Sequence, residues 1–166
     1  MTLAPVDNLL DHLLDARNFP DRPARYRVHG VWESRSTIVH YDITVDDDLE
    51  EWTARDLATQ TLSTYRGGVV TTGADQSPSQ SYRARVTNPA LQLLFPEHLP
   101  VWGRGSRDTD APIETERLDD SHTLVVLRST QDPALRKTLV IDDRTGFVVR
   151  FYDALTVTVL QDLTVV

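Results

Sequence analysis

The stretch Thr138–Asp153, TLVIDDRTGFVVRFYD, carries the clearest structural signal in this 166-residue sequence. Two short apolar runs flank its centre, and their valine, isoleucine and phenylalanine residues favour strands. Gly146 supplies the positive φ that a short hairpin loop needs at its end. Asp142 or Asp143 can hydrogen-bond the backbone of the same turn. The stretch therefore predicts a β-hairpin whose aspartates form the turn rather than an acidic site.

Both faces of this predicted hairpin are mostly apolar. Phe147, Val149 and Phe151 alternate along one face of the second strand, while Val148 and Tyr152 lie on the other. A strand pair that is apolar on both faces is expected to be covered on both sides. We expect a helix, a protein partner or a bound molecule to supply that covering.

Outward from the hairpin, the rest of the chain alternates between short strand patterns and two helical ones. Leucines at helical spacing predict an amphipathic helix over about 5–17, ended by Pro20. Asn88 and Pro89 are a good N-cap and first helical residue, and they predict a short helix over about 88–96. Strands are predicted at 25–32, 37–45, 57–65, 69–72, 81–87, 113–118, 122–128, 136–141, 147–152 and 156–162, with polar loops at 46–51, 73–80 and 103–112.

These elements predict a single α+β domain over 1–166. Its sheet, over about 25–163, is one large antiparallel sheet of about nine or ten strands with the helices gathered on one face. No internal repeat or low-complexity tract is present.

Composition excludes several function classes. The chain has no cysteine, so it has no disulfide, thiolate metal site or cysteine nucleophile. Its net charge of −8 disfavours a nonspecific nucleic-acid binder, which needs a basic face. Lys137 is the only lysine, an arginine bias typical of a bacterial, high-GC genome.

The sequence shows no apolar run long enough to span a membrane and no signal-peptide pattern or lipid-modified cysteine. We therefore expect a cytoplasmic protein without membrane insertion. An extracytoplasmic location is the alternative if a leader was removed before Met1.

The order of elements resembles the LolA-like and RseB-like lipoprotein-carrier fold. The likeness is carried by the leading helix Asn8–Ala16 followed by a strand at Tyr26, the Asn88–Phe95 helix, and the closing strand, Asp-x-x-Thr-Gly turn and strand of Leu139–Arg150. The resemblance implies a curved, open half-barrel whose concave face is partly covered by helices and holds acyl chains or another apolar ligand. Members of this family carry a signal peptide and often a lipidated cysteine, which this chain does not show.

Two polar clusters are candidate sites. Carboxylates of the Asp46-Asp-Asp-Leu-Glu-Glu51 segment could bind Ca²⁺ or Mg²⁺, but the segment lacks the glycine-bearing EF-hand loop, and a solvated acidic turn is the better interpretation. His29 and His40 could face each other on paired strands and form an acid/base or metal site with Asp42. No nucleophile motif or phosphate loop accompanies them. We predict no catalytic residue, metal or cofactor.

Aromatic and aliphatic side chains suggest a ligand site more strongly than titratable groups do, because small-molecule pockets are mostly apolar. The predicted ligand-binding residues are Trp32, Tyr41, Tyr82, Leu94, Phe95, Trp102, Phe147, Val149 and Phe151. The leading hypothesis is a non-enzymatic protein that binds a lipid, acyl chain or apolar peptide on the concave face of the half-barrel. The alternatives are a cytoplasmic protein-interaction module with an acidic surface (accessory, regulatory or immunity-type) and, less favoured, an enzyme that uses His29, His40 and nearby carboxylates.

Overall fold

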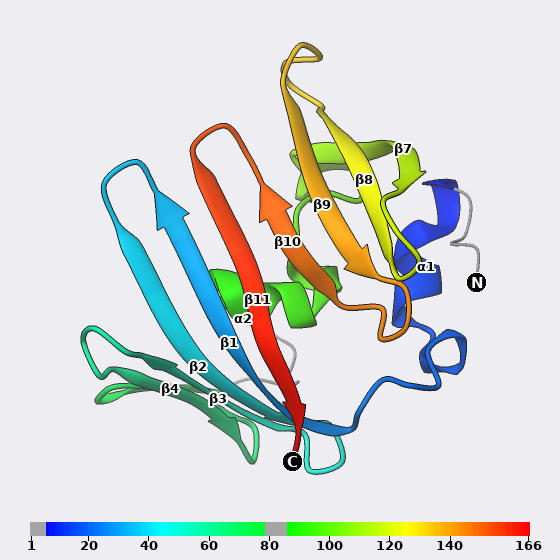
Figure 1. Ribbon diagram of the computed structural model, residues 1–166. Coiled ribbons are helices and arrows are strands. Elements are labelled where there is room, and N and C mark those ends of the chain that lie inside the picture. Colours follow the sequence, from blue (N-terminus) through cyan, green and yellow to red (C-terminus); the bar gives the residue numbers. More distant parts are fainter. Residues whose placement is uncertain (1–5, 79–85) are drawn as a thin grey trace.

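The computed structural model describes residues 6–78 and 86–166, and its centre is one open antiparallel sheet (Figure 1). The eleven described strands lie in the order β6-β5-β4-β3-β2-β1-β11-β10-β9-β8-β7. Their bounds are β1 Arg25–Ser34, β2 Ile38–Asp46, β3 Glu51–Asp56, β4 Leu62–Arg66, β5 Val69–Thr72, β6 Asp75–Pro78, β7 Asp110–Arg117, β8 His122–Ser129, β9 Arg136–Asp142, β10 Val148–Tyr152 and β11 Thr156–Val165. The predicted α+β class and open, curved antiparallel sheet are confirmed, and the last strand pairs with the first.

The helices are short. They are η1 Val6–Asn8, α1 Leu9–Leu14, η2 Ala16–Asn18, α2 Pro89–Leu94, η3 Pro96–His98 and η4 Gly105–Arg107. The helix predicted over 5–17 is therefore wrong in its C-terminal part, because Asp15 accepts a hydrogen bond from the Arg17 backbone N–H and starts a separate turn. The mid-chain helix is confirmed: the Asn88 side chain caps the backbone N–H groups of Ala90 and Leu91, both at 3.0 Å.

The hairpin at Thr138–Asp153 forms, as β9, a turn and β10, but the predicted alternation of its second strand is wrong. A bulge between Val148 and Arg150 places Val148 opposite Ile141 and Phe151 opposite Leu139, so Val148 and Phe151 share one face. Asp142 Oδ1 accepts a hydrogen bond from the Arg144 N–H at 2.9 Å, and Gly146 has a φ of 70°. A Cβ at Gly146 would also lie 2.7 Å from the Phe19 ring, so glycine is required for space as well as for conformation.

Helix α2 packs on one face of the sheet, against β1, β10 and β11, and we call this face the inner face. Gly30 permits the close approach, since a Cβ there would lie 2.4 Å from Ala90 Cβ. Tyr26 of β1 meets Phe147 with ring centroids 5.0 Å apart. The buried core thus lies between the inner face and the helices, and among the described residues no helix lies on the outer face of the sheet in Figure 1.

Several predicted boundaries are wrong. Of the strand predicted over 57–65, only the part that lies in β4 forms. It is preceded by a turn in which Asp56 Oδ1 accepts hydrogen bonds from the backbone N–H groups of Ala58 and Thr59. The segment just before this turn, β3, was missed, and its first residue lies in the predicted acidic loop. Polar strands β6 and the start of β7 also lie in predicted loops, because cross-strand pairing overrides their weak propensity. Of the strand predicted at 81–87, residues 81–85 lie outside the described residues.

Candidate binding cleft between β10 and β11

Strands β10 and β11 pair over a short length only. Arg150, Phe151 and Tyr152 lie opposite Val159, Thr158 and Val157. Beyond Val159, β11 continues to Val165 paired with β1 alone, and Figure 1 shows β10 and β11 diverging there. The sheet therefore opens in its middle, where an ordinary sheet would remain hydrogen-bonded.

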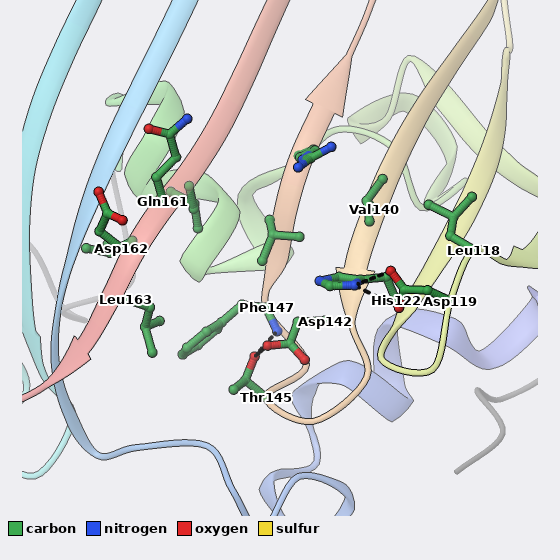
Figure 2. Close-up of a pocket in the computed structure, with 14 residues that line it drawn as sticks. Leu118, Asp119, His122, Val140, Asp142, Thr145, Phe147, Gln161, Asp162 and Leu163 are labelled. Carbon is green, nitrogen blue, oxygen red and sulfur yellow. Dashed lines mark hydrogen bonds and ion pairs between the residues drawn. The ribbon is translucent and has the colours of Figure 1, made fainter.

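A cavity of about 290 Å³ lies at this opening, and we call it the β10–β11 cleft. Small-molecule sites have volumes of about 300–1,000 Å³, so the cleft is near the lower end of that range. Its apolar lining comes from four strands, the turn before β10 and the β7–β8 connection: Val28, Leu118, Val140, Phe147, Val149, Leu160 and Leu163. Figure 2 shows Leu118, Val140, Phe147 and Leu163 around the opening.

Polar side chains surround the apolar lining. They are Asp119, His122, Asp142, Thr145, Arg150, Gln161 and Asp162. Asp142 is held by the turn, since its Oδ2 accepts a hydrogen bond from the Thr145 hydroxyl at 3.1 Å. Asp162 has a φ of 53°, at a bulge opposite Val28 in the β1–β11 ladder. A bulge breaks the regular alternation of side chains between the two faces of a strand. Here four consecutive residues, Leu160 to Leu163, line the cleft.

Asp119 and His122 form the hydrogen-bonded pair drawn at the right of the cleft in Figure 2, with His122 Nδ1 2.9 Å from Asp119 Oδ2. The Ser121 backbone N–H donates to Asp119 Oδ1 at 2.7 Å. This backbone hydrogen bond, helped by His122, lowers the pKa of Asp119 to about 2. Asp119 therefore keeps its negative charge through the physiological pH range.

The predicted ligand-binding residues are dispersed. Phe147 and Val149 line the β10–β11 cleft, whereas Leu94 and Phe95 are fully buried in the core and Phe151 packs against that core. Tyr41 lines a separate, mostly polar hollow on the inner face, where burial raises its pKa. Trp102 lines a hollow beside η1, with its indole N–H donating to the Pro96 carbonyl at 2.6 Å. Trp32 is half-buried on β1, and Tyr82 lies outside the described residues.

The predicted histidine pair does form. His29 Nε2 and His40 Nδ1 are 3.0 Å apart on the outer face, while Asp42 is engaged by Arg27, whose Nε donates to Asp42 Oδ1 at 2.8 Å. This hydrogen bond lowers the pKa of Asp42. Asp46 and Glu51 of the acidic segment pair with Arg25 and Arg66, in keeping with a solvated turn. Within residues 6–78 and 86–166, no three histidine or carboxylate side chains are grouped as metal ligands.

Sequence reasoning missed most of the cleft. Its polar and apolar residues come from segments remote in sequence, and the opening depends on where two strands stop pairing. The one local signal is Gln161-Asp162, a polar interruption in the last apolar strand.

No family model matches this sequence, and no curated protein matches it either. The fold is similar to that of an uncharacterized conserved protein from Thermus thermophilus, with a TM-score of 0.56 and 11% identity over 95% of this chain and 87% of that one. A LolA superfamily protein from Nitrosomonas europaea also matches, with a TM-score of 0.38 and 10% identity over 98% of this chain and 94% of that one.

MucB in the MucA/MucB complex of Pseudomonas aeruginosa matches with a TM-score of 0.41 and 17% identity. The match covers 97% of this chain and 57% of that one. The resemblance to the LolA-like and RseB-like family inferred from the sequence is confirmed, because structures of that family are among those similar to this chain. At these identities the likeness concerns the fold alone. Among the described residues, no helix has the length and apolar character that a membrane span requires.

Proposed function

We propose that this chain is a non-enzymatic binding protein and that the β10–β11 cleft holds the hydrophobic part of its ligand. The observation that carries the proposal is the cleft itself, an opening in the middle of a sheet lined by seven apolar side chains. Leu118 and Leu163 are 52% and 40% exposed at this opening, so a ligand can bury them further. Burying apolar surface is the main source of affinity in such sites.

The cleft explains in part why the hairpin carries apolar side chains on both of its faces. The inner face of β9 and β10 is covered by α2 and the core, but Val140 and Val149 lie at the cleft. Val140 is already buried, whereas Val149 is only half-buried, and a bound apolar group would cover Val149 further, as a hairpin with two apolar faces requires.

A titration with N-phenyl-1-naphthylamine, an uncharged dye that fluoresces in apolar surroundings, tests this function. We expect saturable binding, weakened about ten-fold by Leu163→Glu, because the variant exchanges apolar contact for a desolvated charge. Leu155→Glu is the matched control, since Leu155 is also exposed, at 62%, but lies in the β10–β11 turn outside the cleft. Binding that is absent, or equally affected by both substitutions, would contradict the proposal.

A further inference from the structure

The side of β11 that faces the cleft has an open backbone edge. Strand β11 pairs with β1 along most of its length but with β10 only up to Val159. Beyond that residue, alternate backbone N–H and C=O groups of β11 point toward the cleft, and no strand of the described part of the chain pairs with them there. Such an edge is the usual template for an added strand.

Most of the charged side chains around the cleft are carboxylates. Asp119, Asp142 and Asp162 are carboxylates, while Arg150 is the only arginine or lysine among the described lining residues and His122 is paired with Asp119. Arg144, just outside the lining, pairs loosely with Asp142 at 3.7 Å, which leaves Asp162 as the carboxylate most open to a cationic ligand. The low pKa of Asp119 keeps that carboxylate charged. The whole chain also carries a net charge of −8. These charges favour a cationic ligand and oppose a fatty acid or an anionic lipid headgroup.

From this geometry and charge we infer, as an extension of the proposed function, that the ligand of the β10–β11 cleft is an extended, cationic segment of a protein partner. Its backbone pairs with β11 beyond Val159, its apolar side chains contact Leu118, Val149 and Leu163, and its lysine or arginine side chains meet the carboxylates. The bulge at Asp162 interrupts the edge, so the paired length is short and side-chain contacts contribute much of the affinity.

Fluorescence anisotropy with a short labelled peptide in which valine alternates with lysine and arginine tests this inference. We expect saturable binding, competition with N-phenyl-1-naphthylamine, and little binding of the matched peptide with glutamate in place of the cationic residues. Asp162→Asn should weaken the cationic peptide roughly three-fold, as expected for one exposed charge pair, because asparagine also tolerates the positive φ. Asp132→Asn, at an exposed aspartate in the β8–β9 connection, is the matched control and should change nothing.

Two N-methylated versions of the peptide test the strand pairing. Each carries methyl groups on alternate backbone nitrogens, so one version blocks the N–H groups that face β11 and the other blocks those that face away. We expect one version to bind like the parent and the other to lose at least about ten-fold in affinity, because several backbone hydrogen bonds are lost together. Equal affinity of both versions and the parent would overturn the pairing.

Failure of this inference is distinguishable from failure of the proposed function. If the dye binds and depends on Leu163 but the cationic peptide does not compete, the binding function stands and the peptide inference is wrong. Tighter binding of a fatty acid such as cis-parinaric acid than of the peptide would also overturn it. Light scattering that shows a dimer disrupted by Leu163→Glu would assign the cleft to a second copy of the chain instead.

Discussion

Asp108 is a fully buried carboxylate whose charge is compensated by four hydrogen bonds. The Arg104 guanidinium donates to both of its oxygens at 2.8 Å, and the backbone N–H groups of Trp102 and Arg104 donate to Oδ2. Arg104 also donates to the carbonyls of Glu97 and Leu99, both at 2.9 Å. Burial acts to raise the pKa of Asp108, but the hydrogen bonds from Arg104 outweigh it and the net effect is a lowered pKa. This pair therefore holds the segment between α2 and β7 in one conformation.

Arg104→Ala is expected to lower the free energy of unfolding by about 3 kcal/mol, because it leaves a buried carboxylate without its cationic partner. Urea denaturation at pH 7 measures this change. Arg107→Ala is the matched control, since Arg107 lies in the same segment but is exposed. A loss no larger than that of the control would show that Asp108 is stabilised by the backbone alone.

The same pair predicts a pH dependence. The folded pKa of Asp108 is lower than the ordinary value of 3.8, so ionised Asp108 stabilises the folded state above that value. The contribution is lost as the pH falls through the lowered folded pKa. The difference in stability between wild type and Arg104→Ala should therefore shrink when the denaturation is repeated at acidic pH, and a difference that grows would contradict this assignment.

At the scale of elements, the position of α2 depends on the absence of a side chain at Gly30. The φ of Gly30 is not in the positive region, so space rather than backbone conformation requires glycine there. Ala90 Cβ occupies the volume that a Gly30 side chain would need. A larger residue at either position forces the helix away from β1 and the core.

Gly30→Ala is expected to cost about 2 kcal/mol of stability through overpacking. Ala90→Gly alone should cost about 1 kcal/mol, because glycine is a poor helix former. The double variant should be more stable than the sum of the two effects predicts, since the new methyl group then has room. Thermal or urea unfolding of the four proteins measures this coupling, and strict additivity would mean that the helix does not approach β1 as closely as described.

The elements that sequence reasoning located correctly are those with local determinants. The Asp142–Gly146 turn and the Asn88 cap satisfy their hydrogen bonds within a few residues, so their signals are contained in the sequence itself. Strand β6 and the turn after Asp56 depend on pairing and capping that propensity does not reveal. The cleft is harder still to predict from local sequence, because residues such as Leu118 and Leu163 come together only through the topology of the sheet.

At the scale of the whole molecule, the sheet consists of two parts joined at one weak seam. Strands β6 to β1 and β11 form one part, and β10 to β7 form the other. Only Arg150–Tyr152 of β10 pair with β11 across the seam in the described part of the chain, and α2 contacts strands on both sides of it. Regions with few hydrogen-bonded pairs open with the lowest free energy. The cleft therefore lies beside the part of the sheet best able to open for a ligand.

Asn88→Ala tests whether α2 holds the two parts together. Losing the cap should destabilise α2 by about 1 kcal/mol, so backbone amides of β10 and of Thr156–Val159 should exchange about five-fold faster in native-state hydrogen exchange. The amides of β8, which lie away from α2, should be affected less. Asp56→Ala is the control, because it removes a turn cap in the other part of the sheet and should accelerate exchange in β3 and β4 only. Equal acceleration throughout the sheet in Asn88→Ala would show that the two parts open as one cooperative unit, with no weak seam beside the cleft.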